Sequence, residues 1–121
     1  MSQIKTFEDL NCWKKAYEIR KEISLILKTL PNDEKYGLIP QMKRSSRSVT
    51  HNIAEGYGRF HFKENVQFCR IARGSLYELL DQLIVTKDEL YISEQKYDEI
   101  RLLIMDGIML LNGFINYLKK Q

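Results

Sequence analysis

The sequence predicts an all-α fold: an antiparallel up-down-up-down four-helix bundle formed by a single domain that covers residues 1–121. Three observations support this prediction. The 121 residues are enough for one domain with its own hydrophobic core, and they include only two prolines and six glycines. Apolar residues recur at helical spacings of three and four in four long segments. The loops between these segments are short, so consecutive helices are expected to pack as neighbours.

The first helix is expected to begin between Asp9 and Asn11, because either side chain can cap the free N–H groups of a first turn. It should end at Leu30-Pro31, since proline cannot continue the helical hydrogen-bond ladder. Its predicted apolar face consists of Trp13, Ala16, Tyr17, Ile23, Leu27 and Leu30.

The second helix is expected from near Leu38 to about Tyr57, with Gly56 or Gly58 at its C-terminal stop. Two sets of residues follow helical spacing along it. The first is apolar or small, so other backbones can come close, and consists of Met42, Ser45, Ser46, Val49, Ile53 and Tyr57. The second forms a polar, mostly basic stripe and consists of Arg44, Arg47, His51, Glu55 and Arg59.

The third helix is expected from roughly Glu64 to Leu90. Its predicted inward-facing residues are Phe68, Ala72, Leu76, Leu79, Leu83 and Leu90. Gly74 lies in the interior of this helix, where glycine costs about 1 kcal/mol relative to alanine. We therefore expect another group to lie close to its backbone.

The fourth helix is expected to start after Ser93, which is a suitable N-cap. Between Arg101 and Lys119 its only charged residue is Asp106, and its apolar surface is wider than the single stripe of an ordinary amphipathic helix. This pattern indicates that one face packs in the bundle and another contacts a neighbouring subunit, so a homo-oligomer is predicted.

The composition favours a soluble, cytoplasmic protein. Residues 1–9 lack the apolar core of a signal peptide, and we expect no membrane span because Asp106, Asn112 and Asn116 interrupt the most apolar segment. Cys12 and Cys69 are too few for a secreted disulfide scaffold, so they are expected to be reduced.

The net charge of +3 is unevenly distributed along the chain. Residues 41–73 hold seven basic residues against two acidic ones, whereas the remainder holds twelve basic and fourteen acidic residues. If the second and third helices are neighbours, the basic residues form one patch that can neutralise phosphates: Lys43, Arg44, Arg47, Arg59, Lys63, Arg70 and Arg73. The competing interpretation is a solvated helix face.

Three aromatic residues beside this patch, Tyr57, Phe60 and Phe62, are candidates for stacking on unpaired bases. Alternatively, they close the end of the bundle, and we favour this role for at least one of them. Nothing in the sequence predicts base-specific readout, so recognition by shape or charge is expected.

Four polar residues are predicted to form a structural network rather than a binding site: Asn52, Glu55, Ser75 and Glu78. Asn52 and Glu55 lie one turn apart near a helix end, from which they can hydrogen-bond Ser75, Glu78 or an arginine. Buried polar groups need such partners, and the network would fix the register of the two helices.

No catalytic motif is present, and we predict no enzymatic activity, metal site, cofactor or small-molecule substrate. Ser48, His51 and Glu55 align by helical spacing, but a serine within a helix lacks the sharp turn and oxyanion hole of a hydrolytic triad. A nuclease that uses Glu55, Glu64 and His61 is a distant alternative.

Several short motifs resemble the four-helix-bundle family of 23S rRNA intervening-sequence proteins. They are Asn52-Ile53-Ala54-Glu55-Gly56, Gly58-Arg59 and Ile71-Ala72-x-Gly74-Ser75-x-x-Glu78, with supporting matches at Gln41-x-x-Arg44, Asp9-Leu10-x-x-Trp13-Lys14-x-Ala16 and Pro31-x-x-Glu34-x-Tyr36-Gly37-Leu38. The resemblance covers most of the chain. One departure is His61, which stands where a serine-type helix cap is expected.

This resemblance implies an antiparallel bundle that assembles as a homopentamer, and it carries over no catalytic residues. It also extends to the accessory variability determinant of diversity-generating retroelements, a pentameric bundle that binds nucleic acid and a reverse transcriptase. The resulting hypothesis is a non-enzymatic oligomer that binds structured RNA or a nucleoprotein partner. The alternative is a protein–protein adaptor whose patch docks an acidic partner, such as a reverse transcriptase or a ribosomal component.

Overall fold

The computed structural model describes residues 3–121, and within this range the chain forms four α-helices, two 3-10 helices and no strand. The elements are η1 (Phe7–Asp9), α1 (Asn11–Leu27), η2 (Asn32–Glu34), α2 (Leu38–Gly58), α3 (Phe62–Asp88) and α4 (Glu94–Lys119). The predicted all-α class is confirmed. The helix boundaries fall within a few residues of those expected from the sequence.

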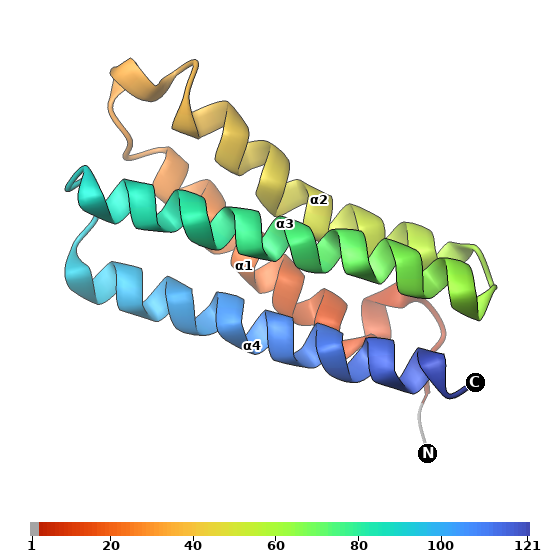
Figure 1. Ribbon diagram of the computed structural model, residues 1–121. Coiled ribbons are helices and arrows are strands. Elements are labelled where there is room, and N and C mark those ends of the chain that lie inside the picture. Colours follow the sequence, from red (N-terminus) through yellow and green to blue (C-terminus); the bar gives the residue numbers. More distant parts are fainter. Residues whose placement is uncertain (1–2) are drawn as a thin grey trace.

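The four α-helices pack around one core (Figure 1). Helix α2 packs against α1 and α3, and α4 packs against the same two helices, which places α2 and α4 at opposite corners of the bundle. The α2–α3 connection, the start of α1 and the C-terminus lie at one end. The α1–α2 and α3–α4 connections lie at the other end.

All four helices supply aliphatic side chains to the core. The largest of the fully buried ones are Ile19, Ile23, Met42, Ile53, Leu76, Leu79, Leu83, Ile100, Ile104 and Leu111. Burying one such side chain contributes about 1.5–3 kcal/mol, so the shared core is the main stabilising term of the bundle.

The helix caps differ in part from those expected. Ser93 caps α4 as predicted, because its hydroxyl accepts a hydrogen bond from the Lys96 backbone N–H at 3.1 Å. Asp9 caps the preceding η1 turn instead of α1: its carboxylate accepts hydrogen bonds from the backbone N–H groups of Lys5 and Thr6. These two bonds lower the pKa of Asp9, since they favour the ionised form.

Two expectations about the helix ends are wrong. Leu90 does not face the core: it lies beyond the end of α3, is 88% exposed and has a φ of 64°. Neither Gly56 nor Gly58 adopts a left-handed conformation at the C-terminal end of α2. Phe60 adopts that conformation instead, with a φ of 54°. A left-handed residue with a side chain costs about 1–2 kcal/mol, so both loops hold local backbone strain.

The glycines of α2 and α3 also differ from expectation. A Cβ on Gly74 would meet no atom within 4 Å, so the predicted close neighbour is absent. The close approach occurs at Gly56, where a Cβ would lie 2.7 Å from Asn65 Oδ1 and 2.8 Å from Phe68 Cβ on α3. Gly56 is therefore a position at which the backbone of α2 closely approaches α3.

Helix α4 carries a row of exposed apolar side chains outside the bundle core. Leu102, Met105, Met109 and Tyr117 are between 39% and 63% exposed, and their spacing places them on one side of the helix. By length and composition alone, α4 could cross a membrane, although we expected no such segment; the core helix of a soluble protein meets the same two conditions. Eight α4 residues are nevertheless buried in the bundle, from Tyr97 to Leu118.

Substitution of the two glycines by alanine is predicted to have opposite effects on stability. Gly56→Ala should destabilise the bundle by about 1–3 kcal/mol, because the added methyl group overlaps Asn65 and Phe68. Gly74→Ala should stabilise it by about 0.4–1 kcal/mol, since the site is open and helical. Chemical denaturation followed by circular dichroism measures both changes. An equal response of the two variants would contradict the packing described for Gly56.

Candidate nucleic-acid interface

The basic residues of α2 lie between its buried positions. Met42, Ser45, Ser46, Val49 and Thr50 are buried, and their spacing leaves the intervening Lys43, Arg44 and Arg47 exposed. Because the buried positions span a wide arc, the exposed basic residues lie at its two margins. Each of them is therefore directed toward one neighbouring helix or the other.

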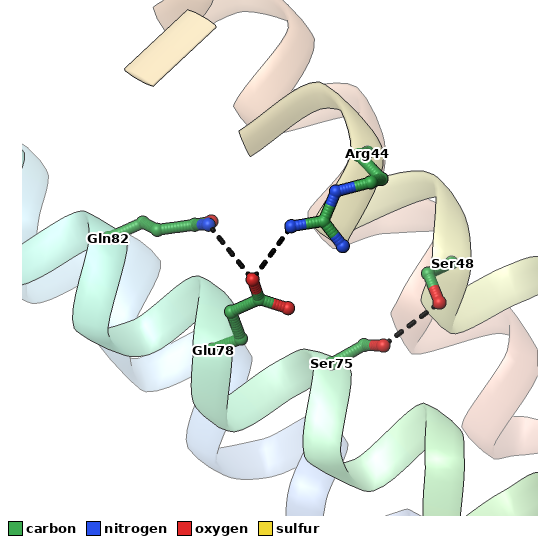
Figure 2. Close-up of polar contacts among 5 residues, drawn as sticks. All are labelled: Arg44, Ser48, Ser75, Glu78 and Gln82. Atoms are coloured by element: carbon green, nitrogen blue, oxygen red, sulfur yellow. Dashed lines mark hydrogen bonds and ion pairs between the residues drawn. The ribbon is translucent and has the colours of Figure 1, made fainter. Parts of the chain in front are cut away.

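Arg44 lies at the margin that faces α3. Its guanidinium donates to Glu78 Oε2 at 2.8 Å, and the Gln82 amide approaches the same oxygen at 3.5 Å (Figure 2). Both partners of the ion pair are partly exposed, so it contributes at most about 1 kcal/mol. Its clearest consequence is electrostatic, because Glu78 neutralises the charge that Arg44 would offer to a phosphate.

Ser48 connects α2 to α3 one turn further along. The Ser75 hydroxyl donates to Ser48 Oγ at 2.9 Å, as Figure 2 shows, and the Asn52 amide donates to Ser48 Oγ and to the Ser48 carbonyl. Asn52 thus bonds to Ser48 of its own helix and not to Ser75 or Glu78. Ser48, which joins Asn52 to Ser75, was not among the residues predicted for this network. Its four-residue spacing from Asn52 did place the two side chains on one face of the helix.

Glu55 pairs with an arginine, one of its predicted partners, but it does so at the surface and not in a buried network. Arg59 Nη2 of the same helix lies 3.1 Å from Glu55 Oε2. The Arg59 guanidinium also lies 3.9 Å from Glu64 and 5.0 Å from the centre of the Phe68 ring. Arg59 is therefore held and largely neutralised at the α2–α3 junction.

The seven predicted basic residues do not form one patch. Arg73 lies on the side of α3 that faces α4, where its guanidinium donates to Asn112 Oδ1 of α4 at 2.8 Å. Lys43 and Arg47 line a groove between α2 and α1. Lys63 and Arg70 are exposed and lie two helical turns apart on the outer surface of α3. Within residues 3–121, no carboxylate lies within 4.0 Å of the charged groups of these last four residues.

The three predicted stacking residues lie at the end of the bundle that holds the α2–α3 connection. Tyr57 packs partly against the core, whereas Phe60 is 85% and Phe62 53% exposed. All three line an open apolar groove of about 870 Å³, to which α4 contributes Met109 and Phe114. Tyr57 thus helps to close the bundle, while the two phenylalanines present their rings to the surface.

At the start of α3, His61 occupies the N-cap position without donating or accepting a capping hydrogen bond through its side chain. Its Nδ1 lies 3.8 Å from Glu64, whose other carboxylate oxygen faces Arg59. The departure of His61 from a serine-type cap is therefore accompanied by an uncapped helix start. Glu64 in the first turn still interacts favourably with the helix dipole.

The two cysteines are buried and lack the features of reactive thiols. Burial raises the pKa of Cys12 and of Cys69 to about 12, so both thiols stay protonated at neutral pH. The described part of the chain also contains no group of three or more His, Cys, Asp or Glu side chains positioned to hold a metal ion.

Known proteins resemble this chain in sequence and in fold. The family model described as 23S rRNA-intervening sequence protein matches residues 8–113. A crystal structure of a protein of unknown function from the S23 ribosomal protein family of Bacteroides thetaiotaomicron has a TM-score of 0.80 to this chain and 24% sequence identity. That match covers 87% of this chain and 95% of the other, and it shows a shared fold. No curated protein matches the sequence. Because the family model spans most of its length, the chain belongs to the 23S rRNA-intervening sequence protein family.

Proposed function

We propose that this protein is a non-enzymatic, homo-oligomeric antiparallel bundle that binds structured RNA through cationic side chains of α2 and α3. The observation that carries the proposal is that four exposed basic residues of the predicted patch have no ion-pair partner among residues 3–121: Lys43, Arg47, Lys63 and Arg70. Exposed cations that are not neutralised by the protein are available to neutralise phosphates and release counterions.

The arrangement of the helices supports two separate uses of the surface. The apolar row of α4 (Leu102, Met105, Met109 and Tyr117) lies at the corner of the bundle opposite α2. A neighbouring subunit can cover this row, as its size and hydrophobicity favour, without covering Lys43 or Arg47. Repetition of the cationic surface in each subunit of a pentamer would then strengthen binding to one long RNA.

The exposed rings of Phe60 and Phe62 add a means of contacting unpaired bases. Base stacking on an aromatic ring contributes about 1–3 kcal/mol and tolerates any base. Charge and stacking together favour structured RNA with accessible loops, recognised by shape and not by base edges.

The absence of catalysis in the proposal is supported by how the candidate groups are used. Ser48 is hydrogen-bonded to Asn52 and Ser75 and not to His51, so the serine has no general base. The Arg59 guanidinium lies beside Glu55 and Glu64, which neutralises the two carboxylates that a nuclease would need to hold a metal ion.

The oligomer is predicted to depend on α4. Light scattering of the wild-type protein should give a multiple of the chain mass, five under the pentamer implied by the family resemblance. Leu102→Glu with Met109→Glu should give a folded monomer, because two charges at a subunit interface would be buried without partners. Leu25→Glu places a charge at an equally exposed apolar position on α1 and should leave the mass unchanged. A monomeric wild type, or one that associates only with lipid vesicles, would contradict this part of the proposal.

RNA binding is predicted to weaken steeply with salt and to depend on the unpaired cations. In fluorescence anisotropy with a structured RNA, Lys63→Gln with Arg70→Gln should reduce the slope of log K against log salt by about one for each phosphate that is no longer neutralised. Lys35→Gln with Lys119→Gln makes the same change in net charge outside the predicted cations and outside the α1–α2 groove, and it should have little effect. Binding of an acidic protein after nuclease treatment, with no RNA binding at low salt, would favour the adaptor alternative and refute the RNA proposal.

A further inference from the structure

A small groove between α1 and α2 collects basic side chains from both helices. It has a volume of about 160 Å³ and is lined by Arg20, Lys21, Ser24 and Leu27 of α1 and by Lys43, Ser46 and Arg47 of α2. Arg20 and Lys21 belong to the first helix, outside the basic segment of residues 41–73. The groove is therefore a charge cluster that depends on the packing of two helices and that sequence position alone did not indicate.

Arg20 is held in a fixed position within this groove. Its Nη1 donates to Thr50 Oγ1 of α2 at 2.9 Å, and the Thr50 hydroxyl in turn donates to the Arg47 carbonyl at 3.2 Å. Arg20 Cζ also lies over the Tyr17 ring, 5.1 Å from its centre. A guanidinium has five N–H donors, so the bond to Thr50 orients it while most of its donors stay available.

The positive charge of the groove is not neutralised by the protein. The two glutamates of α1 nearest in sequence are engaged elsewhere: Glu18 pairs with Lys15 at 3.0 Å, and Glu22 pairs with Lys96 of α4 at 3.4 Å. Among the described residues, none of the four cations of the groove has a carboxylate within 4.0 Å. Four like charges around one groove repel each other. An anion bound between them would be attracted to all four, and this attraction would offset the repulsion.

We propose that this groove is a binding site for a single phosphate group. Its volume of about 160 Å³ is well below the roughly 300 Å³ of an ordinary small-molecule pocket, so it suits a small group such as one tetrahedral oxyanion. The planar donors of Arg20 and Arg47 suit two phosphate oxygens at once, while Lys21 and Lys43 act as mobile point charges. The seryl hydroxyls of Ser24 and Ser46 line the same space and can donate further hydrogen bonds.

The phosphate is either a phosphodiester within an RNA chain or a phosphate monoester, such as an RNA 5′ end. In both cases the groove extends the proposed RNA-binding surface from α2 onto α1, and in this respect the inference rests on the proposed function. As a site for a phosphate group it stands on its own geometry.

The test is an NMR titration of the arginine Nε–Hε signals with inorganic phosphate, compared with sodium chloride at the same ionic strength. The signals of Arg20 and Arg47 should shift with phosphate and saturate, while that of Arg70 on the outer surface of α3 should not. Lys43→Gln with Arg47→Gln should weaken phosphate binding at least about tenfold, because the variant removes two charged hydrogen-bond donors. Lys119→Gln, an exposed change in the last turn of α4 and outside the groove, should leave binding unchanged. Equal shifts at Arg70, or equal effects of chloride, would refute the site.

RNA oligomers with a 5′-phosphate or a 5′-hydroxyl then distinguish the two sources. Loss of affinity on Arg20→Gln for the 5′-phosphate RNA alone assigns a monoester, and equal loss for both assigns a phosphodiester. If RNA binds normally to the Lys43→Gln, Arg47→Gln variant and phosphate causes no saturating shift, the groove proposal fails and the RNA proposal survives. If phosphate saturates the groove but no RNA binds, the site stands and the RNA proposal fails.

Discussion

The close contact between α2 and α3 constrains the rest of this structure. Gly56 brings the two backbones together beside Asn65 and Phe68, and the Ser48–Ser75 hydrogen bond continues the contact two turns away. Large side chains cannot fit along this side of α2, so its arginines and lysines are displaced to the margins. There they pair with α3, as Arg44 does, or face α1, as Arg47 does. Efficient packing and a charged surface thus have the same origin in the small residues of α2.

The order of helices around the core separates two kinds of surface. Helix α2 contacts α1 and α3 but lies diagonally opposite α4, so its cations and the apolar row of α4 occupy different sides of the bundle. The hydrophobic effect favours burial of the apolar row by another subunit, and it does not depend on the charged residues of α2 on the other side of the bundle. RNA binding would depend on charge and respond strongly to salt. Substitution of the α2 cations and substitution of Leu102 or Met105 can therefore change the two interactions separately, whereas Met109 and Tyr117 share a groove with Phe60 and Phe62.

The sequence predicted the helices well and the side-chain partners poorly, and the reason is physical. Apolar periodicity and a serine cap determine where a helix runs, as with Ser93 at the start of α4. They do not determine which margin of a helix meets which neighbour. Arg73 therefore contacts α4 and not α2, and Asn52 bonds to Ser48 and not to Glu78. Gly74, whose neighbourhood was expected to be crowded, is open, because the tight approach falls at Gly56. The cluster of Arg20 with Arg47 arises only from tertiary packing.

Hydroxyl-radical footprinting tests the separation of the two surfaces most directly, because methionine and tyrosine report on both of them. In the protein alone, Met105 and Met109 of α4 should be protected despite their exposure in one chain, whereas Tyr17 beside the α1–α2 groove should react as a side chain that is 38% exposed. Addition of structured RNA should then protect Tyr17 and leave the two methionines unchanged. Protection of Met105 and Met109 only when RNA is added, with no change at Tyr17, would contradict the assignment of α4 to self-association and of the α1–α2 surface to RNA.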